Sequence, residues 1–367
     1  MKNSRRHWFK KTGLAALGLS LAPLEGFAIN DINNTPVVTG DTKIRLSSNE
    51  NPYGPPMASR TAMAAAVNGS NRYSWGQTSR LATAIAKKNG LAEGNVLMSA
   101  GSIEMLDIAG RLAAKAKGSI VIADNTFSYW TRAAVQLGAT TIEVPLTAIK
   151  KVGLNAMLKA MRSDTKLVYI CNPNNPTGTV LKTADLIDFI KEVSHKSIVL
   201  VDEAYIEFTN ETSMATLVKD NKNVIVLRTF SKIYGLAGAR IGYALAHADT
   251  IAEMDKMQAY VLGGISAVSG AGALAALDDT AFVEKTRSLN EAAKNYTVRE
   301  MEKLSINCIP SSTNFLYFSL ANYKKDFFKL LENNNIEGTE IFEEDGKWSR
   351  ITIGTMEDMQ RLIKAIS

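Results

Sequence analysis

The chain has 367 residues, of which 46% are hydrophobic and 21% charged, a composition typical of a soluble globular enzyme with room for two domains around one cleft. The formal charge is +6, but five cations (Lys2, Arg5, Arg6, Lys10 and Lys11) and one anion lie within the first 28 residues. The remainder is close to neutral, so the charge gives no support to nucleic acid as a partner.

Residues 1–28 have the pattern of an export signal. Arg5 and Arg6 are flanked by Ser4 and by aromatic and lysine residues, an apolar run covers 14–24, and small residues follow. The run is shorter than the roughly 20 residues that cross a bilayer, so we expect no stable membrane anchor. The paired arginines resemble a twin-arginine signal, which predicts a periplasmic or otherwise exported protein. The alternative is a basic tail on a cytoplasmic enzyme.

The chain after this signal falls into three predicted parts. Residues 29–75 are polar and rich in turns at their start, and we expect them to form an arm that joins a smaller domain. Residues 76–270 alternate helical and strand patterns and predict a large domain. Residues 271–367 combine helical patterns with strand candidates at 315–318 and 350–353, which predicts a smaller α+β domain.

Short uninterrupted apolar runs predict the sheet of the large domain. They cover 120–123, 167–170, 198–201 and 224–227 and are separated by helical patterns, one of which begins near Thr183 as a candidate N-cap. Strands of this kind are buried on both faces, as in a parallel sheet covered by helices. The sequence therefore predicts a doubly wound, mostly parallel α/β domain.

The cysteines and histidines show no metal-ligand grouping. Cys171 and Cys308 each lie in an apolar run, so two buried thiols are expected rather than a disulfide. His7, His195 and His247 are scattered along the chain. We therefore predict no metal site.

Reactive side chains come directly after three of the apolar runs. The run 167–170 is followed by an amide-rich turn at 172–178, 198–201 by Asp202 and Tyr205, and 224–227 by Ser231 and Lys232. Each group has an ordinary explanation when taken alone, such as a turn, a helix cap or a surface lysine. Ligands of open α/β sheets bind beyond the carboxyl ends of the strands, so together these groups predict one site at that edge.

These motifs, in this order, resemble the fold-type I pyridoxal-phosphate aminotransferases, and within them the histidinol-phosphate aminotransferase group. The similarity extends to residues 49–54, 71–73, 100–102 and 350–355, and covers nearly everything after residue 44. It implies pyridoxal 5′-phosphate as cofactor and transfer of an amino group, through the pyridoxamine form, between a small amino donor and a 2-oxo acid acceptor.

The resemblance also implies roles for particular residues. Lys232 would bind the cofactor covalently and then act as the base, Asp202 would pair with the ring nitrogen, and Asn175 and Tyr205 would contact the ring oxygen. Phe127 would lie over the ring, where the family more often has tyrosine; the alternative is an ordinary core residue. The phosphate would be held by residues at a helix start and after the last strand: Gly101, Ser102, Thr229, Ser231 and Arg240.

Two further roles concern the substrate and the assembly. Arg350 resembles the carboxylate-binding arginine of the family, and Asn51, in the arm, is a second candidate substrate-binding residue. Tyr73 would reach the phosphate from a second subunit, which implies a homodimer with shared active sites.

The chain departs from the histidinol-phosphate aminotransferase pattern at positions that concern the substrate. Thr339 stands where the family usually has an arginine, Gly263 and Gly264 stand where it has an aromatic–proline pair, and the arm lacks a Pro-Tyr element. Groups that would bind a distal phosphate are thus absent. We expect an ordinary amino acid to be a better substrate than histidinol phosphate.

Two other functions are compatible with the same cofactor cradle. One is a decarboxylase of the same fold, similar to the enzymes that decarboxylate phosphothreonine. The other is a non-catalytic regulator that binds the cofactor, but residues 1–75 carry no helix-turn-helix pattern for DNA. Aminotransferase activity remains the leading prediction.

Overall fold

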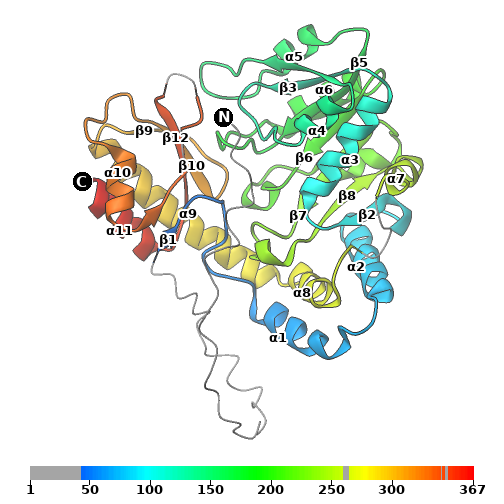
Figure 1. The fold of residues 1–367 in the computed structure, drawn as a ribbon, viewed down its shortest axis with the longest axis horizontal. Coiled ribbons are helices and arrows are strands. Elements are labelled where there is room, and N and C mark those ends of the chain that lie inside the picture. The colour runs from blue at the N-terminus through cyan, green and yellow to red at the C-terminus, as the bar shows by residue number, and fades with distance from the viewer. Residues whose placement is uncertain (1–42, 259–263, 340, 344–345) are drawn as a thin grey trace, which may run out of the picture. The chain divides into compact units, whose positions relative to one another are not determined.

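A seven-stranded sheet forms the centre of the computed structural model, which describes residues 43–258, 264–339, 341–343 and 346–367 (Figure 1). The strand order is β2-β8-β7-β6-β5-β3-β4. β3 pairs in parallel with β4 and β5, β5 with β6, and β6 with β7, whereas β8 is antiparallel to β7 and β2. The strands are β2 (Val96–Ser99), β3 (Ser119–Ala123), β4 (Thr140–Val144), β5 (Thr165–Cys171), β6 (Ile198–Asp202), β7 (Val224–Thr229) and β8 (Gly242–Ala246). The prediction of a mostly parallel α/β sheet is confirmed.

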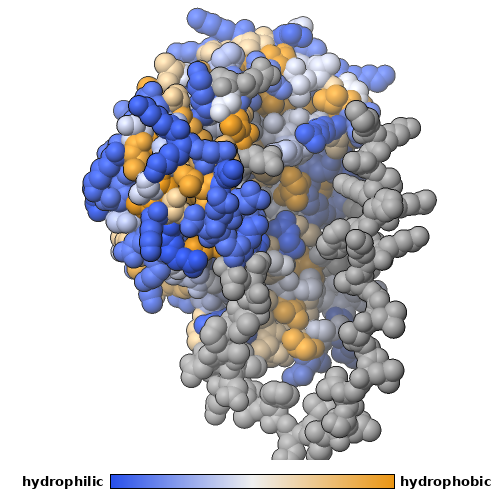
Figure 2. All heavy atoms as spheres, turned by 60° about the vertical axis from the view of Figure 1, so that its left-hand side comes forward, coloured by the Kyte–Doolittle hydropathy of each residue, from blue (hydrophilic) through white to orange (hydrophobic). Residues whose placement is uncertain are grey.

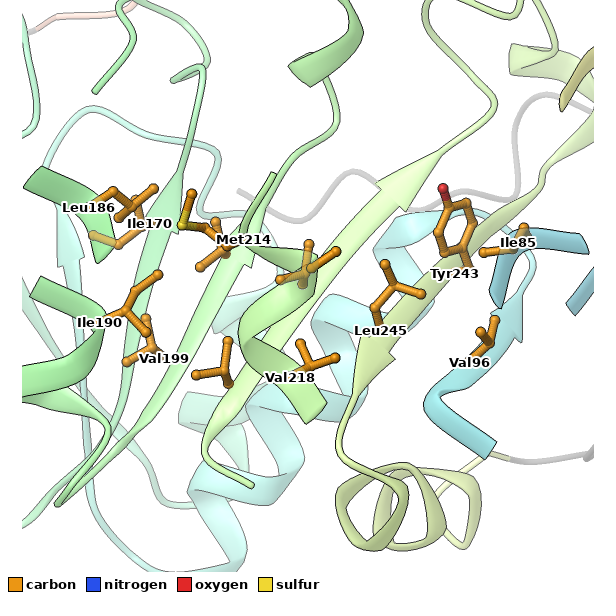
Figure 3. Close-up of a cluster of buried hydrophobic side chains, with 14 of the residues drawn as sticks. Ile85, Val96, Ile170, Leu186, Ile190, Val199, Met214, Val218, Tyr243 and Leu245 are labelled. Carbon is orange, nitrogen blue, oxygen red and sulfur yellow. The ribbon is translucent and has the colours of Figure 1, made fainter. Parts of the chain in front are cut away.

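Helices cover both faces of this sheet. Alternate residues of one strand pack into different cores: Val199 and Val201 point to one face and Leu200 to the other. The first face, part of which Figure 3 shows, is covered by α2 (Trp75–Lys88), α5 (Leu154–Ala160), α6 (Thr183–Val193) and α8 (Ala267–Leu277). The second is covered by α3 (Ser102–Lys115), α4 (Thr131–Gln136) and α7 (Ala248–Asp255). Burial on both faces explains why the strands read as continuous apolar runs.

The two ends of the described chain share a third core, separate from the two on the faces of the sheet. β10 (Phe315–Ser319) is antiparallel to β9 (Asn307–Ile309) and β12 (Trp348–Thr352), and β1 (Ile44–Arg45) is parallel to β11 (Ile336–Glu337). The helices that accompany them are α9 (Thr280–Lys303), α10 (Phe327–Asn333) and α11 (Met356–Ile366). Leu46, next to β1, packs in one cluster with Leu316, Ile351 and Leu362. The arm therefore contributes to the core that the C-terminal residues build.

The remaining elements are short or peripheral. α1 (Met57–Ala66) lies against α8. The 3₁₀ segments are Val67–Gly69, Glu93–Asn95, Ile206–Phe208, Met214–Lys219 and Ala237–Ala239. No helix within the described ranges is both long and apolar enough to cross a membrane. The face shown in Figure 2 is mainly hydrophilic, with scattered hydrophobic side chains.

The start of α6 differs from the prediction by one position. Thr183 is the first residue of this helix and Lys182 holds the cap position. The backbone and hydroxyl of Thr183 instead donate to the Glu211 carboxylate. The predicted signal, residues 1–28, lies outside the described residues, and the boundaries 29–75, 76–270 and 271–367 stay predictions.

Candidate functional site

A cavity of about 880 Å³ opens at the carboxyl edge of the seven-stranded sheet. β5, β6 and β7 are parallel neighbours, so their carboxyl ends meet there, and Asp202 pairs with Cys171 on one side and Leu227 on the other. Ten of the predicted site residues line this single cavity: Ser102, Phe127, Asn175, Asp202, Tyr205, Thr229, Ser231, Lys232, Arg240 and Arg350.

Asp202, the last residue of β6, presents a buried carboxylate to the cavity. The backbone N–H of Ala204 donates to Oδ1 over 3.0 Å, and the Tyr169 hydroxyl donates to Oδ2 over 3.1 Å. Burial raises the pKa of Asp202 to about 6, against the opposing effect of these hydrogen bonds and of Lys232. The carboxylate is therefore anionic at neutral pH, in surroundings that favour a cationic partner.

Lys232 follows β7 and its amine is directed at the same cavity. Nζ donates to the backbone oxygens of Ser48 and Asn49, over 3.2 and 3.3 Å. Burial, together with the charge of Arg350, lowers the pKa of Lys232 to about 8. About a tenth of the amine is thus unprotonated at pH 7, far more than for an ordinary lysine, and this is the form that a nucleophile or base requires.

An anion cradle lies at the start of α3. Gly101 has a φ of 88°, and a Cβ at this position would lie 2.3 Å from Nη2 of Arg240, so only glycine fits. Nη1 of Arg240 is 3.5 Å from the Ser231 hydroxyl, which accepts a 2.9 Å hydrogen bond from Thr229. Helix-start amides, hydroxyls and a guanidinium are the groups that bind phosphate.

Arg350, on β12, forms the opposite wall. Its guanidinium donates to Oδ1 of Asn175 over 2.5 Å and to the backbone oxygen of Ser47 over 2.6 Å, and its Nε is buried without a partner. The group lies 5.4 Å from the ring centroid of Phe315 and 5.2 Å from that of Phe342. Nη1 and Nη2 each keep a second N–H, so a guanidinium held in this way is suited to a carboxylate.

Some predicted residues do not line the cavity. Gly101 lies behind it, against Arg240. Asn51 uses both ends of its side chain within the chain: Nδ2 donates to the backbone oxygen of Ile233, and Oδ1 accepts from the N–H of Tyr53. Tyr73 is 74% exposed and stacks on Trp75. In a single chain, therefore, neither Asn51 nor Tyr73 faces the cavity.

Among the positions at which the chain departs from the histidinol-phosphate aminotransferase pattern, some line the cavity and others do not. Thr339 does line the cavity, and its hydroxyl donates to the backbone oxygen of Ser47 over 3.1 Å. Gly264 lies apart from the cavity, beside Ile265 in a second, smaller hollow next to β2, and Gly263 lies outside the described residues.

Several residues of the cavity were not predicted from the sequence. Asn49 has a left-handed backbone with a φ of 54°, and its Nδ2 donates to the Tyr205 hydroxyl over 2.9 Å. Asp124, Asn125 and Thr126 come directly after β3 and also line the cavity. The latter three could have been found, because they stand at the end of the apolar run 120–123 just as Asp202 stands at the end of 198–201.

Comparison with known proteins agrees with this geometry. The Aminotransferase class I and II family model matches residues 41–366. The histidinol-phosphate aminotransferase of Moorella thermoacetica is 35% identical over 329 residues, which is 88% of this chain and 84% of that protein.

Solved structures show the same fold. A putative histidinol-phosphate aminotransferase from Erwinia carotovora atroseptica superposes with a TM-score of 0.84 at 28% identity, over 88% of this chain and 95% of that one. The histidinol-phosphate aminotransferase of Sinorhizobium meliloti, in complex with pyridoxal-5′-phosphate, has a TM-score of 0.82 at 24% identity, over 94% and 98%. With a family match over almost the whole described chain, this protein belongs to the class I and II aminotransferases.

Proposed function

We propose that this aminotransferase holds pyridoxal 5′-phosphate in the cavity and uses it to move an amino group between a small amino donor and a 2-oxo acid. The observation that carries the proposal is the pairing, in one cavity, of an amine of lowered pKa (Lys232) with a buried carboxylate (Asp202). The cofactor, when bound, accepts the amino group and withdraws electrons from the donor's Cα.

The described residues fit the cofactor at both ends. Because Gly101 has no Cβ, the guanidinium of Arg240 can lie close to the start of α3. The backbone amides of the helix start and this guanidinium are then both available to a phosphate. At the other end, no Lys or Arg of the described chain forms an ion pair with Asp202, so a protonated ring nitrogen would supply the missing cation. Phe127 would cover one face of the ring.

Tyr205 and Asn175 suit the ring oxygen. Burial raises the pKa of Tyr205, so its hydroxyl keeps its proton while it accepts from Asn49. Oδ1 of Asn175 accepts from Arg350, which leaves its amide N–H groups to donate. Lys232, unprotonated in part, would bind the cofactor and then take the proton from the Cα of the donor.

The activity is tested with purified protein and a panel of amino acids. We expect the absorption of the bound cofactor to change when a good donor is added. One molecule of 2-oxo acid should be formed for each molecule of cofactor converted. Release of carbon dioxide without a 2-oxo acid would instead indicate decarboxylation and overturn the proposal.

For the substrate, we propose that an ordinary amino acid is preferred over histidinol phosphate. Arg350 offers a carboxylate site, whereas Thr339 adds no cation to the cavity wall. Each lost charge-assisted phosphate bond should lower kcat/KM about tenfold to a hundredfold. Steady-state assays with both substrates test this, and Thr339→Arg should raise kcat/KM for histidinol phosphate selectively. A clear preference of the unaltered enzyme for histidinol phosphate would contradict the proposal.

We also propose export by a twin-arginine route, supported by the sequence of residues 1–28 alone. The mature chain should begin near Ile29, and Arg5→Lys with Arg6→Lys should retain a folded, active precursor in the cytoplasm. Cell fractionation with N-terminal sequencing measures both. A full-length cytoplasmic protein that is indifferent to the two substitutions would remove the proposal.

Finally, we propose a homodimer in which Tyr73 of one subunit completes the phosphate site of the other. Its support is the exposure of Tyr73 and its stacking on Trp75, which leave an aromatic pair available to a second copy. Light scattering measures the mass, and Tyr73→Phe should weaken cofactor binding without dissociating the dimer. A fully active monomer would contradict this assembly.

A further inference from the structure

Trp130 and Tyr169, behind the cavity wall, connect two residues that face the cavity. Nε1 of Trp130 donates to the backbone oxygen of Phe127 over 3.1 Å. The Trp130 ring meets Tyr169 edge to face, with centroids 5.3 Å apart. The Tyr169 hydroxyl then donates to Oδ2 of Asp202 over 3.1 Å. One continuous path thus runs from Phe127 to Asp202.

Both rings are tightly enclosed. Trp130 is 3% exposed and Tyr169 is 1% exposed. Gly110 of α3 makes room for the indole, since a Cβ there would lie 3.1 Å from Cε3 of Trp130 and 3.1 Å from the Cβ of Ala134. Packing of this kind leaves a side chain little freedom to change rotamer. The hydroxyl of Tyr169 is therefore held on Asp202.

The electrostatics around Asp202 give this hydrogen bond its importance. Lys232, Glu203, Cys171 and Tyr205 are the other titratable groups that act on or near the carboxylate. Burial beside Asp202 raises the pKa of Tyr169, so the phenol remains protonated and acts as donor. A hydrogen bond donated to a carboxylate stabilises its charged form.

We propose that Tyr169 and Trp130 are positioning residues: Tyr169 keeps Asp202 anionic and aimed into the cavity, while Trp130 fixes both Tyr169 and Phe127. The inference rests on the proposed binding of pyridoxal phosphate with its ring nitrogen at Asp202. A carboxylate and a ring nitrogen that face each other compete for one proton. Because a carboxylate that accepts two hydrogen bonds is the weaker base, the proton stays on the nitrogen, where the reaction needs it.

The test observes that proton directly. Enzyme reconstituted with cofactor labelled with ¹⁵N in the ring is examined by NMR at neutral pH, as wild type and as Tyr169→Phe, which keeps the ring and its contact with Trp130. We expect the ratio of protonated to unprotonated nitrogen to fall about tenfold to a hundredfold, as loss of one hydrogen bond to a charged group implies. The ¹⁵N resonance should move towards the position of a neutral pyridine.

Two further variants make the result specific. Trp130→Phe removes the bond to Phe127 and loosens Tyr169, so its resonance should shift in the same direction but less. Tyr323→Phe is the matched control, because the Tyr323 hydroxyl donates to the Ile366 backbone in the C-terminal core, away from the cavity. Its resonance should equal that of the wild type.

Asp202→Asn separates failure of this inference from failure of the proposed function. A shift in Asp202→Asn without a shift in Tyr169→Phe would overturn the positioning role alone. Equal shifts in Tyr169→Phe and Tyr323→Phe would also overturn it, since any lost tyrosine hydroxyl would then suffice. An unchanged resonance in Asp202→Asn would overturn the assignment of Asp202 to the ring nitrogen, and this inference with it.

Discussion

One wall of the cavity carries Asp202, Lys232 and Asn175, which lie at the ends of the neighbouring strands β6, β7 and β5 of the seven-stranded sheet. The facing wall carries Asn49 and Arg350, which are about 300 residues apart in the chain and meet through the Thr352 hydroxyl and the arm backbone. The first wall forms because the carboxyl ends of parallel neighbouring strands meet at one edge of the sheet. The second forms where the two ends of the chain contact each other. The first wall holds the titratable groups that face the proposed cofactor site, while the second holds the guanidinium that would meet the donor's carboxylate.

The two walls also differ in their electrostatics. Lys232 and Asp202 both have pKa values shifted towards neutrality, chiefly by burial in the sheet wall. Arg350 is also buried, with its pKa lowered by desolvation, but an arginine remains charged at any physiological pH. We therefore expect proton transfer to depend on the sheet wall, and binding of the donor's carboxylate on the facing wall.

The largest effect should follow from Lys232→Ala. The variant loses the only amine that the described chain directs into the centre of the cavity, so turnover should fall by several orders of magnitude while the fold persists. Cofactor should bind without a covalent link, and the yellow absorption of the purified protein should change. Lys222→Ala is the control, since Lys222 pairs with Asp249 on the surface. A variant that transaminates at a rate comparable to wild type would remove Lys232 from its assigned role.

Asp202→Asn should have the next largest effect. It removes the negative charge that keeps the ring nitrogen protonated, and this support matters most once charge develops on the donor's Cα. We expect kcat to fall about a hundredfold to a thousandfold, comparable to removal of other preorganised groups, and cofactor affinity to fall much less. Stopped-flow half-reactions and cofactor titrations measure the two losses. Equal losses would point to a structural role only.

Arg350→Lys sharpens the contrast between the walls. Lysine keeps the charge but loses the planar fork, and one charge-assisted hydrogen bond is worth about a tenfold to hundredfold change in binding. KM for amino acids should rise by this factor, while kcat and the cofactor spectrum change little. Arg111→Lys, in a surface pair with Asp107, serves as control. A fall in kcat with an unchanged KM would assign Arg350 to the chemistry instead.

The smallest effect concerns stability without cofactor. The pKa of Lys232 is lowered to about 8 in the folded chain, from 10.5, so the stability it contributes is fully present above pH 10.5 and is lost as the pH falls through 8. Lys232→Met should therefore be more stable than wild type below pH 8, by about 1 kcal/mol after solvent screening. The difference should close towards pH 10.5. Chemical denaturation of both proteins across this range checks it, and a difference independent of pH would attribute the gain to packing alone.

Local patterns in the sequence predicted the sheet wall well. The apolar runs before Asp202 and Lys232 are the buried strands β6 and β7, and parallel pairing brings their ends together, so spacing along the chain was sufficient. The family resemblance implied a helix start just after Gly101 and Ser102, and α3 begins at Ser102. The edge strands β2 and β4 and the antiparallel β8 were not predicted, because their short segments lack an equally distinct apolar run.

Only the tertiary structure decided the facing wall and the second layer of the site. Asn49 donates to the Tyr205 hydroxyl because the arm contacts β12. Tyr169 donates to Asp202 because side chains of β5 point alternately to the two faces of the sheet, and Tyr169 points to the face from which it reaches this carboxylate. These contacts join residues distant in sequence, and no local pattern specifies which side chains will meet. The sequence by itself thus determined the α/β fold and the groups at the strand ends, because burial and strand direction are local properties. Packing between distant segments determined which residues form hydrogen bonds with those groups, and where Arg350 stands to bind the donor's carboxylate.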